Sequence, residues 1–207
     1  MPMKTLDQIA IGHGTDKATS HPIVREGKGH GYTPFYDELF TPLREAPIKF
    51  LEIGVGGAES IKTWLEYFPN ARIFGVDIVH DTNPWNTPGT VADPRYTFNQ
   101  GDQSDDTFWK CFLADHGGNW DVVIDDGGHA SNQIITTFKH LWPALKAGGL
   151  YCIEDLACAY SGISGFCPSG WQNHMDFVKD MLDAINREQR EIKSLHYSRE
   201  LAIIRKS

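Results

Sequence analysis

Two short acidic segments carry the side chains best suited to chemistry. The first is DDGGH, with Asp125, Asp126 and His129, and the second is IED, with Glu154 and Asp155. Each follows an apolar run typical of a buried parallel strand, and neighbouring strand ends lie about 4.8 Å apart. Carboxylates that converge in this way repel one another, so a divalent cation would balance them. Oxygen ligands without cysteine favour Mg²⁺ or a similar hard ion, although solvated loop acids beside one structural histidine are the alternative.

A glycine-rich turn upstream predicts a nucleoside-like cofactor. Glycines after a strand let the backbone approach a ligand, and Asp77 follows Gly54 by about the 20 residues at which an acid meets ribose hydroxyls. An acid at the third strand end would accept a hydrogen bond from an adenine amino group. A tight turn without a ligand is the alternative for this motif alone, and a dinucleotide is disfavoured because the full GxGxxG is missing. The candidate cofactor-binding residues are Glu52, Gly54, Gly56, Asp77, Asp102, Gln103 and Asp125.

The elements that must position these residues follow an α/β pattern. From residue 48 onward, apolar runs alternate with helix-period segments, which predicts a Rossmann-like, mostly parallel sheet with helices on both faces. We expect one helix over 59–68 and another from 131 to the glycines at 148 and 149, with Pro143 loosening its last turn. A third helix should follow later in the chain, with one apolar face in the core. That face would contain Val178, Met181, Leu182, Ile185 and Ile192. The expected strands are 48–53, 72–76, 96–100, 120–124 and 150–153, with one or two more over 195–205.

About 45 residues rich in Gly, His, Thr and Tyr precede the first expected strand, and only 36–43 suggests a helix. We expect residues 1–47 to form a flap over the site and 48–207 to form the α/β domain, one domain overall. His30, Tyr32 and Tyr36 are candidate substrate contacts in the flap, and Tyr160 is another beside the Gly/Ser-rich loop at 161–170. Packing is the alternative role of these aromatic residues. Nothing in the sequence places the other histidines beside the site.

The composition narrows the class of protein. The chain has 207 residues, with 19 Lys and Arg against 27 Asp and Glu, a net charge of −8. A nucleic acid or an anionic membrane is therefore a disfavoured partner. The start of the chain lacks an apolar signal region and no segment is apolar enough to span a membrane, so we expect a cytoplasmic protein. The four cysteines form no CxxC pair, and we expect reduced thiols packed as small hydrophobic groups.

From residue 48 onward the chain resembles class I S-adenosylmethionine-dependent methyltransferases. Their first motif, acidic-x-Gly-x-Gly-x-Gly, is matched by Glu52, Gly54 and Gly56, with Ala58 at the place of the last glycine. The resemblance implies that residues 48–207 are a methyltransferase domain. It also favours S-adenosylmethionine over a dinucleotide.

The DDGGH and IED segments, with GTDK and HGYT before them, resemble the Mg-dependent macrolide sugar O-methyltransferases of the mycinamicin 2''-O-methyltransferase type. This resemblance implies that Asp126, Glu154 and Asp155 bind Mg²⁺ and that His129 is the general base. The family has a large N-terminal auxiliary domain that this sequence does not contain. The oligomeric state and the range of substrates are therefore open, and a homo-oligomer is possible.

We therefore expect methyl transfer to a hydroxyl of a sugar or glycosylated natural product, a small-molecule substrate. The metal would lower the pKa of the hydroxyl, and a histidine with an ordinary pKa near 6.5 would take the proton. The alternatives are a cephalosporin-hydroxylase-like protein, an O-methyltransferase for phenols or catechols, and a non-catalytic S-adenosylmethionine-binding protein. A pure binding protein has no need of a base beside a metal.

Overall fold

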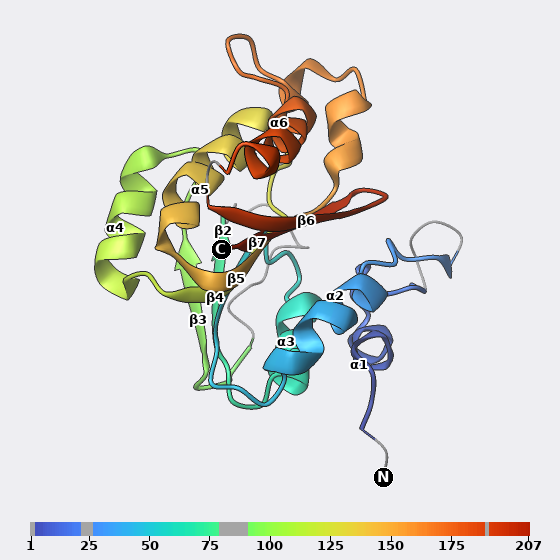
Figure 1. Cartoon of the computed structure of the whole chain (residues 1–207). Coiled ribbons are helices and arrows are strands. Elements are labelled where there is room, and N and C mark those ends of the chain that lie inside the picture. Colours follow the sequence, from blue (N-terminus) through green and yellow to red (C-terminus); the bar gives the residue numbers. More distant parts are fainter. Residues whose placement is uncertain (1–2, 22–26, 79–90, 189–190) are drawn as a thin grey trace.

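The computed structural model describes residues 3–21, 27–78, 91–188 and 191–207. Its centre is a seven-stranded sheet in the order β3-β2-β1-β4-β5-β7-β6 (Figure 1). Strands β1 to β5 run parallel, and β7 is antiparallel to both β5 and β6. The predicted α/β fold with a mostly parallel sheet is confirmed. The strands are β1 (Lys49–Ile53), β2 (Arg72–Asp77), β3 (Tyr96–Gln100), β4 (Trp120–Asp125), β5 (Leu145–Ile153), β6 (Ile192–Ser198) and β7 (Leu201–Lys206).

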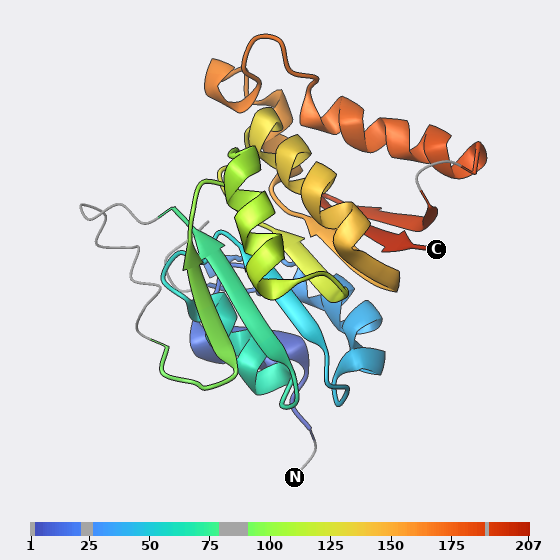
Figure 2. The same cartoon turned by 90° about the vertical axis from the view of Figure 1, so that its left-hand side faces the viewer.

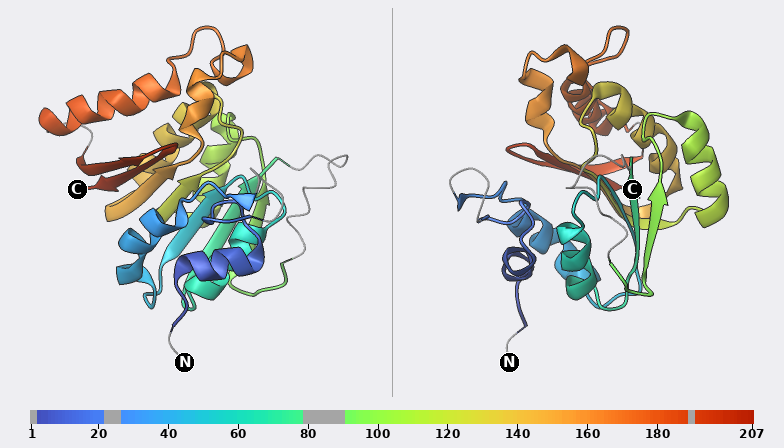
Figure 3. Two further views of the ribbon diagram at one scale, coloured as in Figure 1. Left: turned by 90° about the vertical axis from the view of Figure 1, so that its right-hand side faces the viewer. Right: turned by 180° about the vertical axis from the view of Figure 1, so that it is seen from behind.

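Helices cover both faces of the sheet, with α1 to α3 on one and α4 to α6 on the other (Figures 1, 2 and 3). The side chains of β4 show why, because Val122 and Ile124 enter the core beneath α1 to α3 whereas Val123 enters the opposite core. The helices are α1 (Leu6–His13), α2 (Thr33–Phe40), α3 (Glu59–Tyr67), α4 (Asp106–His116), α5 (Ser131–Ala144) and α6 (His174–Asn186), with short 3-10 turns η2 (Thr41–Leu43), η4 (Leu156–Tyr160) and η5 (Ser164–Phe166).

The N-terminal segment contains more helix than we predicted. Helix α1 begins with a capping box between Thr5 and Gln8 and ends at Gly14, whose φ of +77° is left-handed. Residues Leu6 and Ile9 bury its apolar side. The expectation of a single helix over 36–43 is therefore wrong. That helix is α2, which begins three residues earlier and is followed by a 3-10 turn.

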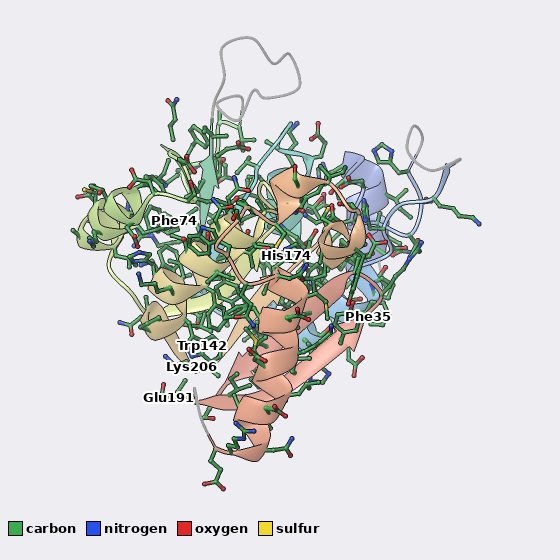
Figure 4. All side chains as sticks on the ribbon, turned by 90° about the horizontal axis from the view of Figure 1, so that it is seen from above. Phe35, Phe74, Trp142, His174, Glu191 and Lys206 are labelled. Atoms are coloured by element: carbon green, nitrogen blue, oxygen red, sulfur yellow. The ribbon has the colours of Figure 1, made fainter. Side chains whose placement is uncertain are left out.

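Helix α5 ends earlier than predicted. It stops at Ala144, and Gly148 and Gly149 lie inside β5 instead of ending the helix. The ammonium of Lys206 explains this end, because it donates to the carbonyls of Trp142 at 3.0 Å and Leu145 at 3.1 Å. Figure 4 shows Lys206 beside Trp142 at this end of the helix.

Two further expectations about helices are wrong. Leu182 on α6 is 49% exposed, and Ile192 lies in β6, so neither belongs to the buried helical face. We also did not predict α4, which is capped by Asp105 and buries Trp109 and Phe112.

None of the helices in the described residues is long and apolar enough to cross a membrane. All four cysteines are free, but only Cys152 is buried, so packing as a small hydrophobic group holds for one thiol.

Candidate active site

A cavity of about 890 Å³ lies at the carboxyl ends of β1 to β4, where open α/β sheets bind ligands. Residues 13–17 and His21 of the N-terminal segment also line it. Contrary to our expectation, this places two further histidines, His13 and His21, at the cavity. Another, His80, lies outside the described residues. The predicted site residues that line the cavity are Gly54, Gly56, Asp77, Asp102, Gln103, Asp126, His129 and Asp155.

In the glycine turn, the backbone of Gly54 packs directly against the backbone of Asp126. Gly54 has a φ of +83°, and a Cβ there would lie 1.9 Å from the carbonyl oxygen of Asp126. The N–H groups of Val55 and Gly56 donate to Oδ2 of Asp77 at 2.8 and 2.9 Å. Asp77 thus holds the turn as well as lining the cavity. Ala58 has a φ of +68°, which suits the glycine that the methyltransferase motif usually has there.

The side chain of Gln103 supports the DDGGH turn by joining Asp125, at its start, to Gly128. The Gln103 amide donates to Oδ1 of Asp125 at 3.0 Å, and its oxygen accepts from the N–H of Gly128 at 2.8 Å. Burial raises the pKa of Asp125 to about 6. Asp125 is 1% exposed and lies behind the cavity wall, whereas exposed Asp102 lines the cavity and accepts from Ser104.

Glu52 lies under the glycine turn and is fully buried. Its Oε2 accepts hydrogen bonds from Ser60 at 2.9 Å and from the Trp64 indole at 3.1 Å. Burial raises the pKa of Glu52 to about 7. Among the described residues, Glu52 is not part of the cavity lining, so a cofactor would reach it only through the turn above.

The sequence reasoning missed Lys17, whose positive charge balances part of the acidic cluster that we assigned to a divalent cation alone. Its side chain is 2% exposed, and its ammonium lies 2.7 Å from Glu154, 3.4 Å from Glu52 and in direct contact with Asp126. Burial alone would lower the pKa of Lys17, but the three carboxylates raise it well above its ordinary value. The signal is the GTDK segment, whose last residue is Lys17 and which belongs to the family resemblance.

Three groups remain gathered at the cavity. One ligand atom each from Asp126, His129 and Asp155 lies within 4.8 Å of the other two, and His129 Nε2 is 3.6 Å from Asp155 Oδ2. His129 and Asp155 have φ values of +56° and +55°, a strained conformation that tends to mark functional sites. The two carboxylates supply the oxygen ligands that a hard divalent cation prefers, and the imidazole beside them can act as a base. The carboxylates of Asp126 and Asp155 therefore fit Mg²⁺.

Glu154 lies outside this group of three. It is 1% exposed, and its two oxygens accept from Tyr36 at 2.6 Å and Lys17 at 2.7 Å. Burial, together with the charge of Asp126, raises the pKa of Glu154 well above its ordinary range. The structure thus brings together two members of the predicted metal trio with His129 and ties the third to the N-terminal segment.

Three of the four candidate substrate residues lie beside the carboxylates, and the fourth is exposed elsewhere. Tyr36 is fully buried, Tyr32 is 2% exposed, and their hydroxyls point at Glu154 and Asp155. His30 lies 3.2 Å from Asp155. None of these three is among the described lining of the cavity, and Tyr160 is 65% exposed on η4. The positions of these four side chains therefore do not support a contact with substrate, which stays a prediction.

No protein-family model matches the chain. Among curated proteins it is similar to a rhamnosyl-tetracenomycin-C 3'-O-methyltransferase of Streptomyces olivaceus, with 34% identity over 89% of this chain and 46% of that protein. It is also similar to the mycinamicin VI 2''-O-methyltransferase of Micromonospora griseorubida, with 35% identity over 77% of this chain and 41% of that protein. The chain therefore spans about half the length of the curated relatives it matches.

Solved structures agree with these relatives. The methyltransferase MycE of the mycinamicin pathway, in complex with Mg, S-adenosylhomocysteine and mycinamicin VI, superposes with a TM-score of 0.81 and 31% identity. That match covers 99% of this chain and 55% of MycE. The chain is therefore a homologue of the macrolide sugar O-methyltransferases of the mycinamicin type and has their class I methyltransferase fold.

Proposed function

We propose that this protein transfers a methyl group from S-adenosylmethionine to a sugar hydroxyl of a glycosylated small molecule, with Mg²⁺ as the metal. The observation that carries the proposal is the position of Asp126, His129 and Asp155 at one end of a cavity formed by the glycine turn. Two curated relatives are named as a rhamnosyl-tetracenomycin-C 3'-O-methyltransferase and a mycinamicin VI 2''-O-methyltransferase, and MycE was solved with Mg and S-adenosylhomocysteine.

Each group at the site has a part in this chemistry. Gly54, Gly56 and Asp77 would bind the cofactor along the cavity, with Asp102 and Gln103 toward its adenine. Asp126 and Asp155 would hold the metal, and the family resemblance adds Glu154. When bound, the metal lowers the pKa of an acceptor hydroxyl and fixes its oxygen.

His129 is the proposed general base. Its Nε2 lies 3.6 Å from Oδ2 of Asp155, and this carboxylate would stabilise the imidazolium that forms when His129 takes the hydroxyl proton. Asp155 remains ionised, because Tyr32 and the neighbouring histidines outweigh the effect of burial and lower its pKa. A charged carboxylate therefore lies beside the proposed base.

We also propose that residues 48–207 act as the methyltransferase domain and that 1–47 form its cap. The cavity lining from residues 13–17 supports a cap over the cofactor end. The expected cytoplasmic location and a homo-oligomeric state remain predictions.

The test is the metal-dependent formation of S-adenosylhomocysteine from a panel of rhamnosylated and other glycosylated natural products. The proposal expects turnover with Mg²⁺, its loss in excess EDTA and its return when Mg²⁺ is added back. Saturable cofactor binding with no turnover across the panel would instead favour a non-catalytic binding protein. Turnover that persists in EDTA would contradict the role of the metal.

A further inference from the structure

The N-terminal segment donates hydrogen bonds to every carboxylate of the predicted metal trio. Lys17 contacts Asp126 and Glu154, and the Tyr36 hydroxyl donates to Glu154 at 2.6 Å. The Tyr32 hydroxyl donates to Oδ1 of Asp155 at 2.6 Å. The carboxylates come from the ends of β4 and β5, so a segment far away in the sequence fixes their orientation.

The two tyrosine hydroxyls are not explained by packing. The Tyr36 ring stacks on Phe40 at 4.9 Å and meets Trp64 edge-on at 5.9 Å, contacts that a phenylalanine would make equally well. Burying a hydroxyl costs free energy unless it is hydrogen-bonded. Each buried hydroxyl therefore acts through the carboxylate that it meets.

Tyr32 forms hydrogen bonds with both the side chain and the backbone of Asp155. Its hydroxyl donates to the side chain and, at 3.4 Å, accepts from the backbone N–H of the same residue. Asp155 is in the left-handed conformation, which needs support from its surroundings. With Tyr32 on Oδ1, the other oxygen, Oδ2, faces His129 and belongs to the group gathered at the cavity.

The donors are themselves held as one unit. The carbonyl of Lys17 accepts from the N–H of Tyr32 at 2.8 Å, which ties the two donors together. Asp7 on α1 accepts from the backbone and hydroxyl of Thr19 at 2.8 and 2.6 Å and from the Thr33 hydroxyl. Helix α1 therefore anchors the loop that carries both donors.

We propose that Tyr32 and Tyr36 are positioning residues of the metal site: their hydroxyls hold Asp155 and Glu154 for a divalent cation, in place of a contact with substrate. This inference rests on the proposed function, because it needs a cation at the site. Hydrogen-bond partners of metal ligands commonly change metal affinity by about 10- to 100-fold when they are removed.

The test is a titration of the full chain with Mn²⁺, a hard ion whose free form is measured by electron paramagnetic resonance. The variants Tyr32→Phe and Tyr36→Phe each remove one oxygen atom. The matched control is Tyr67→Phe, because buried Tyr67 donates to Asp37 at 2.5 Å, away from the site. Thermal unfolding of all the variants measures the cost to stability separately.

We expect the dissociation constant for Mn²⁺ to rise about 10- to 100-fold in Tyr32→Phe and at least several-fold in Tyr36→Phe. Tyr67→Phe should bind Mn²⁺ as the wild type does, whatever its loss of stability. Affinities of Tyr32→Phe and Tyr36→Phe that match the control would overturn the positioning role alone. A wild-type protein that binds no Mn²⁺ would instead contradict the metal-dependent function on which this role rests.

Discussion

The Cα of Gly54 faces the backbone carbonyl of Asp126 so closely that a Cβ on Gly54 would lie 1.9 Å from that oxygen. This contact joins the turn proposed to bind the cofactor to the strand end proposed to bind the metal. The two halves of the site therefore pack directly against each other, at a separation that leaves no room for a side chain on Gly54.

Gly54→Ala should damage both halves together. The methyl group meets backbone atoms, which cannot turn aside, so we expect at least a tenfold loss of S-adenosylmethionine affinity and roughly 2 kcal/mol or more of stability. Calorimetric titration and urea unfolding measure these effects. Gly12→Ala is the control, since a Cβ there meets nothing within 4 Å and alanine suits helix α1. Unchanged cofactor affinity in Gly54→Ala would contradict the coupling.

His129→Asn should lose turnover but keep cofactor binding. Asparagine tolerates the left-handed backbone of this position and cannot act as a base near neutral pH. We expect kcat to fall about 10²- to 10⁴-fold, with an S-adenosylmethionine dissociation constant within a few-fold of wild type. Single-turnover kinetics at saturating acceptor measure the change. Unaltered turnover would remove His129 from the mechanism.

Asp155→Asn should abolish metal binding while keeping the fold. The amide suits the left-handed conformation but lacks the charge that a hard cation needs. Activity should not recover at any Mg²⁺ concentration. Asp16→Asn is the control, because Asp16 lines the cavity and is half-exposed but lies outside the group of three. Full activity of Asp155→Asn in excess EDTA would be incompatible with a metal held at this position.

Glu52 should make stability depend on pH. Burial raises its pKa from 4.5 to about 7, so between these values the folded protein keeps a proton that the unfolded chain has lost. Raising the pH across this window therefore favours unfolding, with a slope of at most about 1.4 kcal/mol per pH unit from this group. In Glu52→Gln, the free energy of unfolding should therefore decline less between pH 5 and 7 than in the wild type. Urea unfolding without metal, at several pH values in this range, measures the difference.

Asp93, which pairs with Arg95, supplies the control for this prediction. The pKa of Asp93 is lowered by Arg95, which stays charged throughout, so Asp93→Asn should leave the slope above pH 5 unchanged. An equal slope in the wild type and Glu52→Gln would show that Glu52 does not carry the linkage.

The sequence was sufficient for the parallel core of the sheet. Strands β1, β2 and β4 are short, largely apolar runs bounded by turn residues, and the observed ends of β1 to β4 fall within one residue of the predicted ones. The carboxyl ends of these strands gather Gly54, Asp77 and Asp126 at one cavity because parallel strands end at the same edge. Local pattern and topology together are enough for that much of the site.

Partners that are distant in sequence account for what was missed. Lys17 lies in a polar loop and meets Asp126 and Glu154 more than a hundred residues later, so no periodicity reveals its burial. The ammonium of Lys206 donates to carbonyls at the end of α5, about sixty residues earlier in the chain. The burial of Tyr36 likewise depends on α3 and β5. Such pairings follow from the tertiary fold and have no local signal.

The most direct test of the account is an isothermal titration of the protein with S-adenosylmethionine, with and without Mg²⁺, repeated on Asp77→Ala. Asp77 lines the cavity and holds the glycine turn through two backbone N–H groups. We predict saturable binding to the wild type and its loss in the variant. No binding to the wild type under either condition would contradict the methyltransferase function and leave the carboxylate group as a metal site for another chemistry.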